Sequence, residues 1–113
     1  MAKPKDVVIT VLVGGQVYVH PDPVHISFGD DGEVTWRCIG GSAVVTFPGD
    51  TPFRAKNKQY HVPDGGSVSS GPPEGKHKVR TDPYKYNVEV TIPNALSGKE
   101  DIFKKDPEVV VDP

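Results

Sequence analysis

Apolar and polar residues alternate with a period of two in several segments of this chain. In the segment 33–37, Val34 and Trp36 alternate with polar residues, so an extended backbone places the apolar side chains on one face. The same alternation runs through 84–92. This pattern predicts half-buried β-strands, with Trp36 as the largest single part of the core. The other residues predicted to join that core are Phe28, Phe47, Tyr86, Val88 and Val90.

Turn-forming residues separate the alternating segments at short intervals. The chain has 12 glycines and 12 prolines, many of which lie between apolar runs. The predicted strands are 7–13, 16–20, 25–28, a strand centred on Trp36, 43–47, 59–62, 67–70, 77–80, 84–92 and 108–112. A turn is predicted at 81–83, and 94–105 is the only segment with room for a helical turn, which Gly98 would keep short. Short strands with frequent turns predict an all-β sandwich or barrel.

Length and composition indicate one soluble domain. The chain has 113 residues, which is enough to bury a core without disulfides, and we expect a single domain over 1–113 with a flexible N-terminus at 1–5. The formal net charge is −2 and the pI is about 6.0, so no overall field attracts nucleic acid or anionic lipid. The single cysteine, Cys38, cannot form an internal disulfide.

The start of the chain carries positive charge, but no apolar stretch of signal-peptide length follows it. The longest apolar run, Val7–Val13, is much shorter than the roughly 20 residues that cross a bilayer. These features predict a cytoplasmic protein that makes no membrane contact. A periplasmic or secreted location would follow if a leader segment had been removed.

Several short motifs occur in an order that is typical of one β-sandwich family. They are a Gly-Asp turn leading into Val34–Trp36, the turn Gly40–Ser42, the returning segment Val45–Phe47, then Thr51–Phe53, Tyr84–Tyr86 and the closing segment Asp106–Asp112. In this order they resemble the cupredoxin-like domain family, and the resemblance covers residues 5–112. It implies a Greek-key sandwich of two sheets, in which many members hold one copper ion for electron transfer. An immunoglobulin-like adhesion module would share the sandwich pattern, but Asp106–Asp112 disfavours it.

The resemblance does not extend to the copper ligands. A blue-copper centre uses two imidazoles, a thiolate and a weak axial ligand. Ala43 and Val44 occupy the positions of the family's first histidine, Val88 that of its cysteine, and Thr91 that of its second histidine. The sole methionine is Met1. We therefore expect no type-1 copper site and no cofactor.

A relocated metal site is the alternative hypothesis. His20 and His25 flank the rigid turn Pro21–Pro23, and with Cys38 they would supply two imidazoles and a thiol, which suit zinc or copper(I). His61 and His77 are the remaining histidines. The competing interpretation is that these histidines lie scattered on the surface and that Cys38 is a small buried apolar residue.

No motif in the sequence indicates catalysis. Ser42 lacks the strand–turn–helix context of a nucleophilic serine, and neither His61 nor Asp64 has a visible nucleophile to pair with. Ser97–Lys99 resembles the end of a phosphate-binding loop, but the upstream glycine and strand are missing. We therefore expect that the protein is not an enzyme.

The middle of the chain is basic and contains tyrosines. The residues are Arg54, Lys56, Lys58, Lys76, Lys78, Arg80 and Lys85, among Tyr60, Tyr84 and Tyr86. A cationic surface with exposed aromatic rings could bind single-stranded nucleic acid. However, alternating charged residues also solvate the outer face of a sandwich and discourage edge pairing, and this is the interpretation we favour.

These observations predict a monomeric, non-enzymatic binding module. Sandwich domains commonly recognise partners through loops at one end or through a sheet edge. The candidate recognition loops are Pro21–Pro23, Pro48–Phe53 and Gly71–Gly75, and the expected partner is another protein. Nucleic acid is not an expected partner.

Overall fold

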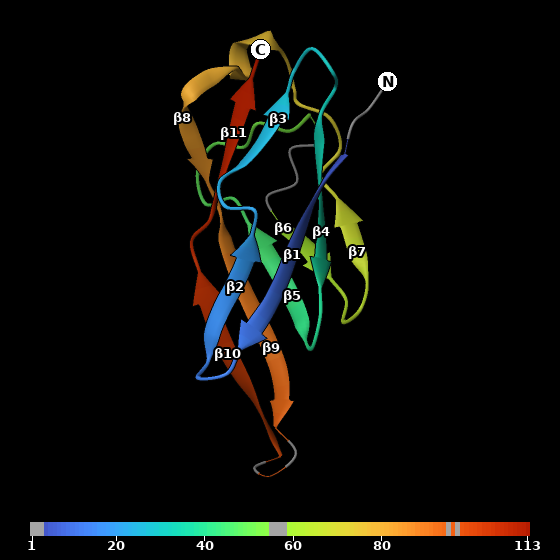
Figure 1. The fold of residues 1–113 in the computed structure, drawn as a ribbon, viewed down its shortest axis with the longest axis vertical. Coiled ribbons are helices and arrows are strands. Elements are labelled where there is room, and N and C mark those ends of the chain that lie inside the picture. The colour runs from blue at the N-terminus through green and yellow to red at the C-terminus, as the bar shows by residue number, and fades with distance from the viewer. Residues whose placement is uncertain (1–3, 55–58, 95, 97) are drawn as a thin grey trace.

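Nearly all regular structure in this protein is β-strand (Figure 1). The computed structural model describes residues 4–54, 59–94, 96 and 98–113. Its strands are β1 (Pro4–Leu12), β2 (Gln16–His20), β3 (Val24–Ser27), β4 (Glu33–Cys38), β5 (Ser42–Thr46), β6 (Gln59–Val62), β7 (Ser67–Ser69), β8 (Arg80–Lys85), β9 (Asn87–Asn94), β10 (Lys99–Lys105) and β11 (Glu108–Asp112). A 3-10 turn, η1 (Lys76–Lys78), precedes β8. No helix in these ranges is long and apolar enough to cross a membrane. The prediction of an all-β fold is confirmed.

The strands form three sheets, with the orders β2-β1-β4-β7, β10-β9-β5-β6 and β3-β11-β8. Two pairings are parallel and join distant parts of the chain: β1 with β4, which places Val7 opposite Trp36, and β3 with β11. The remaining pairings among the described strands are antiparallel.

The second and third sheets continue into one another. Only Tyr86 separates β8 from β9, and only residues 106–107 separate β10 from β11. The Tyr86 N–H donates a hydrogen bond to the Pro107 carbonyl oxygen at 3.0 Å across this junction. The resulting long, bent layer packs against the sheet that contains β1 and β4, in an elongated molecule of 49 × 24 × 21 Å. The sandwich-like packing of sheets is therefore confirmed.

An aromatic cluster around Trp36 fills the centre of the core. The Trp36 ring is fully buried, and its centroid lies 4.9 Å from that of Tyr60, 5.8 Å from Tyr86, 6.1 Å from Phe53 and 6.2 Å from Phe47. Tilted and edge-on pairs at these distances are favourable because the positive edge of one ring meets the negative face of another. The predicted central role of Trp36 is confirmed.

Two buried polar atoms lie within this cluster. Burial strongly raises the pKa of the Tyr86 hydroxyl, and the nearby Trp36 indole N–H offsets only part of that rise. Among the described residues, neither Trp36 Nε1 nor Tyr86 Oη meets the geometry of a hydrogen bond. Burying these two atoms without a hydrogen bond costs free energy, which the aromatic packing around them must offset.

The prediction of a strand at 77–80 is wrong over 77–79. Lys76–Lys78 forms the turn η1, closed by hydrogen bonds from the Lys78 N–H to the Gly75 carbonyl at 3.0 Å and from the Val79 N–H to the Lys76 carbonyl at 3.1 Å. The strand begins only at Arg80 and runs through 81–83, so the predicted turn there is wrong. The alternation in the sequence was misleading here, because Lys78 turns inward toward an acidic partner.

The helical turn predicted within 94–105 is also wrong over its second half. Lys99–Lys105 is strand β10, which pairs along β9 with Ile102 opposite Thr91. Most of its side chains are exposed and charged, so the apolar alternation that marks a strand is weak. Backbone hydrogen bonding to β9 decides the conformation, and the charges suit an edge strand.

The strand boundaries are otherwise close to those predicted. Strand β6 has the predicted limits, whereas β1 begins at Pro4, and Lys5 already pairs with Val34. Phe28, predicted as core, is partly buried and packs against the core cluster. Lys56 and Lys58 of the predicted basic stretch, and residues 1–3, lie outside the described residues.

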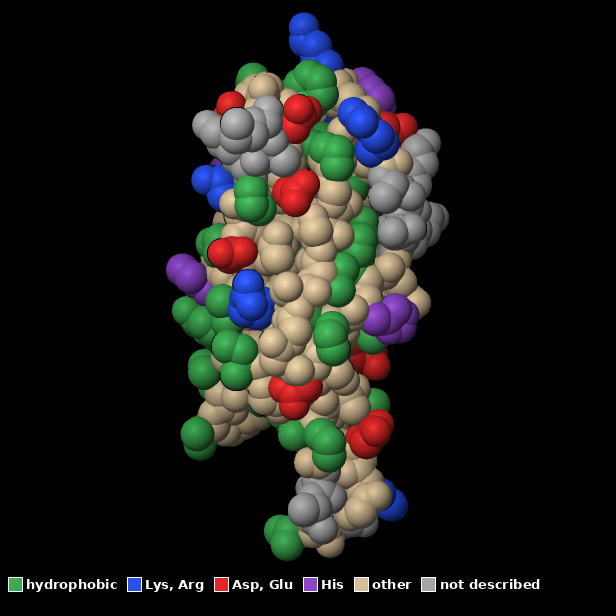
Figure 2. All heavy atoms as spheres, turned by 90° about the vertical axis from the view of Figure 1, so that its right-hand side faces the viewer, with side chains coloured by type: hydrophobic (Ala, Val, Ile, Leu, Met, Phe, Trp, Pro, Cys, Tyr) green, Lys and Arg blue, Asp and Glu red, His purple; other side chains and the backbone are tan. Residues whose placement is uncertain are grey.

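The hairpin of β9 and β10 projects from one end of the body, away from the chain termini (Figures 1 and 2). Leu96 at its tip is fully exposed, and so is Val13 in the turn between β1 and β2. The C-terminus lies at the opposite end of the molecule, together with the loop between β3 and β4 and the loop between β7 and β8 (Figure 1).

Candidate functional site

Two of the three predicted recognition loops meet in the structure. The loop 48–54 and the loop 71–79 are joined by hydrogen bonds from the Arg54 N–H to the Pro72 carbonyl at 3.0 Å and from the Glu74 N–H to the Pro52 carbonyl at 2.7 Å. Phe53 anchors the first loop, because its ring is buried edge-on against Trp36. We call the exposed side of these two loops, together with Arg80, the loop surface.

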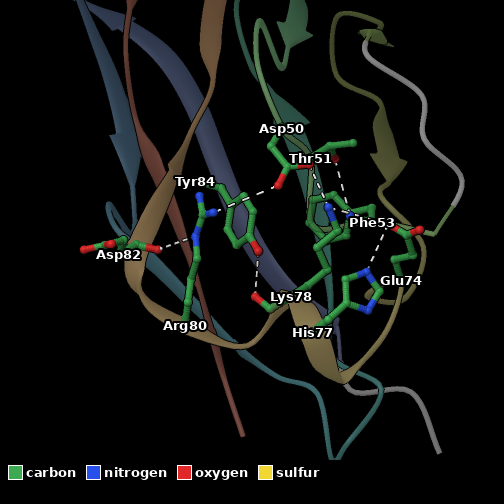
Figure 3. Close-up of polar contacts among 9 residues, drawn as sticks. All are labelled: Asp50, Thr51, Phe53, Glu74, His77, Lys78, Arg80, Asp82 and Tyr84. Atoms are coloured by element: carbon green, nitrogen blue, oxygen red, sulfur yellow. Dashed lines mark hydrogen bonds and ion pairs between the residues drawn. The ribbon is translucent and has the colours of Figure 1, made fainter.

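Lys78 links the two loops through its side chain (Figure 3). Its Nζ lies 2.6 Å from Asp50 Oδ1 and 3.6 Å from Glu74 Oε2. The hydrogen bond from Lys78 lowers the pKa of the Asp50 carboxyl, and the same bond raises the pKa of the Lys78 ammonium. Because the Lys78 side chain is only 12% exposed, water screens this contact less than it screens an ordinary surface ion pair.

Arg80 continues the network onto β8 (Figure 3). Its guanidinium lies 3.7 Å above the Tyr84 ring, and one terminal nitrogen is 4.0 Å from Asp50 Oδ2. The Tyr84 hydroxyl donates to the Lys78 carbonyl at 2.7 Å, and burial raises the pKa of that hydroxyl. The Arg80 Nε also donates to the Asp82 carbonyl at 3.1 Å, so its side chain lies over this edge strand. Sheet extension at β8 is therefore disfavoured.

The loop surface carries an excess of cationic groups. Its charged basic residues are Arg54, Lys76, Lys78 and Arg80, its acidic residues are Asp50 and Glu74, and His77 lies among them. Lys76 and Arg54 are exposed, and the His77 Nε2 is 3.9 Å from Glu74 Oε2. An apolar hollow of about 480 Å³ adjoins η1 and is lined by Phe28, Lys76, Val79 and Pro113. The surface can therefore offer donors and positive charge beside a small apolar contact.

The third predicted loop lies elsewhere. The Asp22 side chain accepts a hydrogen bond from the Glu108 N–H at 3.0 Å, which holds Pro21–Pro23 against the start of β11. The loop Pro21–Pro23 is therefore not part of the loop surface.

The structure separates the residues proposed for a relocated metal site. His20 is exposed on β2 and stacks on Tyr18, with ring centroids 6.0 Å apart. Cys38 is fully buried, and this burial, with the nearby Asp64 carboxylate, raises the pKa of its thiol. His25 is exposed on β3, and its Nδ1 lies 3.0 Å from Asp112 Oδ2. In the part of the chain that the structure describes, no three or more His, Cys, Asp or Glu side chains are grouped to hold a metal ion.

Two of the four residues that the predicted resemblance assigns to copper-ligand positions are core residues. Ala43 on β5 and Val88 on the neighbouring strand β9 are both buried. Ala43 lies opposite Val90, and Ser42 lies opposite Thr91. The side chains of Ala43 and Val88 add apolar contacts here and contain no metal-ligating atom.

The catalytic candidates do not assemble. Asp64 accepts a hydrogen bond from the Gly40 N–H at 3.2 Å, and His61 lies exposed on β6. A serine, a histidine and an aspartate do meet at Ser27, His25 and Asp112, because β3 pairs in parallel with β11. The Ser27 hydroxyl, however, donates to the Pro113 carbonyl at 2.8 Å. The sequence gives no local signal for this grouping, since Asp112 is 85 residues from Ser27 and 87 from His25.

The tyrosines of the basic stretch do not form a stacking surface. Tyr60, Tyr84 and Tyr86 are all buried, so their rings cannot receive exposed bases. The Tyr60 hydroxyl is directed toward the Ser70 carbonyl at 3.5 Å, and burial raises its pKa. The basic residues that the structure describes thus lack the aromatic partners that single-stranded nucleic acid would use.

No protein-family model, curated protein or solved structure matches this chain. The geometry of the described residues is therefore the basis for a functional assignment. Of the candidate sites, the loop surface combines the most charged groups with the most extensive hydrogen bonding between loops.

Proposed function

We propose that this protein is a cupredoxin-like, Greek-key interaction domain without a type-1 copper site, and that it binds a protein partner through the loop surface. The motifs that resemble the family fall on β4, β5, β8 and β11, on the turns next to them and on the loop that contains Thr51–Phe53. Apolar residues at Ala43 and Val88 argue against the family's copper chemistry.

The observation that carries this proposal is that the loops 48–54 and 71–79 hold each other in place. Backbone hydrogen bonds join them, Phe53 anchors them in the core, and the Lys78 side chain contacts acidic groups on both. A surface that is already ordered loses little conformational entropy on binding, so more of the contact energy appears as affinity.

The charge of the loop surface suggests the chemistry of the partner. Arg54, Lys76 and His77 are exposed there, whereas Glu74 is drawn toward Lys78 and His77. A partner segment with carboxylates around one apolar side chain would pair with the cations and could enter the hollow beside η1.

Photo-crosslinking tests the proposal. A benzoylphenylalanine at position 76 should capture a defined partner in the source cells, whereas one at Ser67, exposed on β7, should not. With the purified partner, charge reversal at Arg54 and Lys76 should weaken binding by at least about tenfold, as expected for two lost ion pairs. Reversal at the exposed Lys5 and Arg37 serves as the matched control.

Equal capture from positions 76 and 67, or equal affinity of the two charge-reversed variants, would refute this role of the loop surface. A stoichiometric Cu(I) or Zn(II) complex with chemical-shift changes at His20, His25 or Cys38 would instead support the metal-binding alternative.

A further inference from the structure

The outer face of the sheet β10-β9-β5-β6 is hollowed into a groove of about 370 Å³, which we call the polar groove. Its lining residues are Val44, Thr46, Gln59, His61, Asn87, Val88, Glu89, Lys104 and Asp106. They come from each strand of this sheet and from the residue that follows β10. The polar groove is built from a different part of the chain than the loop surface, and its function does not depend on that of the loops.

Strand pairing arranges the polar groove into two rows. In the first row, His61 lies opposite Val44, Val44 opposite Glu89, and Glu89 opposite Lys104. The second row runs through Gln59, Thr46 and Asn87, and Asp106 follows at its end. Adjacent strands are about 4.8 Å apart, and residues two apart on a strand are about 6.7 Å apart. The groove therefore presents a regular array of polar groups.

The array mixes donors and acceptors with little net charge. The amides of Gln59 and Asn87 each donate and accept, and the Thr46 hydroxyl does the same. The Lys104 ammonium lies 4.0 Å from Glu89 Oε2, so these charges offset one another. Among the described lining residues, Asp106 carries the one further formal charge, and it is negative. This balance opposes phosphate, sulfate and nucleic acid as ligands.

The array is also too polar for a typical protein interface. Such an interface is organised around a buried apolar or aromatic centre. Val44 is the only partly exposed apolar residue in the lining, because Val88 is buried. Val44 and the exposed imidazole of His61 lie side by side and together offer one small, flat contact.

We propose that the polar groove binds a neutral oligosaccharide. Sugar hydroxyls both donate and accept hydrogen bonds, which matches the amides, the carboxylates and the hydroxyl of the two rows. One ring packs its C–H face on Val44 and His61, while neighbouring rings bond to Gln59 and Asn87.

Titration of the ¹⁵N-labelled full chain with cellohexaose, xylohexaose, maltohexaose and chitohexaose tests this proposal. At least one of these probes should cause saturable chemical-shift changes centred on the groove residues. In the Gln59→Ala/Asn87→Ala variant its affinity should fall by about fivefold for each lost hydrogen bond. The matched control is Gln16→Ala/Ser67→Ala, which removes exposed polar groups from the other sheet and should leave the affinity unchanged.

Three results would overturn the proposal: no saturable change with any of the four probes, changes centred outside the groove, or equal affinity of the groove variant and the wild type. Tighter binding of a sulfated form of the active probe would also overturn it, because Asp106 should repel the added charge while the Glu89 and Lys104 charges offset one another.

Discussion

The contact between Asp50 and Lys78 should measurably stabilise the fold, because it joins two irregular loops. We consider Asp50→Asn, which removes the charge but keeps the shape, and Lys78→Met, which keeps the buried stem but removes the ammonium. The residues are 28 positions apart in the sequence, and Lys78 Nζ lies 2.6 Å from Asp50 Oδ1. The double variant completes a thermodynamic cycle that isolates the pairwise term.

The burial of the two side chains sets the expected magnitude. A hydrogen bond to a charged group contributes about 1.5–3 kcal/mol when well shielded, and an exposed ion pair about 0.2–1 kcal/mol. The Asp50 side chain is 54% exposed and that of Lys78 is 12% exposed, so the contact lies between these cases. After this discount for solvent screening, we expect a coupling free energy of about 1 kcal/mol.

The coupling should depend on pH in both directions. The pKa of Asp50 is lowered in the folded state, so its contribution is present above the unfolded value of about 3.9 and is lost as pH falls through the folded pKa. The pKa of Lys78 is raised, so its contribution is present below about 10.4 and is lost as pH rises through the folded pKa. The coupling is therefore greatest between about pH 5 and pH 9.

Urea unfolding of the wild type, the two single variants and the double variant at several pH values measures this coupling. At neutral pH, adding 1 M NaCl should reduce it, because the Debye length falls to about 3 Å. A coupling below about 0.3 kcal/mol at neutral pH and low salt, or one that stays constant from pH 3 to 7, would refute the reasoning.

Three further predictions concern the core. Gly41→Ala should lower the free energy of unfolding in urea by about 2 kcal/mol, because a Cβ there would lie 2.8 Å from the Thr91 carbonyl oxygen. The control Gly49→Ala, which has open space around the Cβ, should change that free energy by less than about 0.5 kcal/mol. Equal effects of the two substitutions would contradict this prediction. Tyr84→Phe should cost about 1 kcal/mol by losing its 2.7 Å hydrogen bond, while Tyr86→Phe should be neutral or stabilising, and the reverse order would be inconsistent with the structure. Cys38 should react with a thiol reagent at least about a hundredfold more slowly in the folded protein than in urea, because burial shields the thiol and raises its pKa. Rapid labelling under native conditions would show that β4 is accessible.

The sequence predicted the strands best where one face is buried and the other exposed. β4 alternates as predicted, with Trp36 and Cys38 buried and Arg37 exposed between them. β6 begins and ends at the predicted residues. Alternation of this kind is a local consequence of the pleat, so it can be seen in the chain without knowledge of the neighbouring strands.

The wrong predictions, at 77–79, 81–83 and 99–105, fall in segments that contact distant parts of the chain. β10 is a strand because β9 supplies backbone hydrogen-bonding partners, although its own side chains are mostly exposed and charged. η1 is a turn, and its Lys78 side chain bonds to Asp50 on another loop. Local backbone hydrogen bonds close η1, whereas the pairing of β10 with β9 and the contact of Lys78 with Asp50 join residues that form no local pattern in the sequence.

The same distinction applies to the candidate sites: the sequence contains their individual residues and loops, but only the tertiary structure brings them together. Glycine and proline in the sequence mark 48–53 and 71–75 as loops, but only the tertiary structure places them in contact. The polar groove likewise contains residues that are unremarkable in the sequence and become neighbours through the register of β5, β6, β9 and β10. Periodicity along one strand depends on backbone geometry alone, so it can be recognised from the sequence of that strand. The identity of a neighbouring strand or loop depends on how the whole chain packs its apolar faces, and so it is decided only when the chain folds.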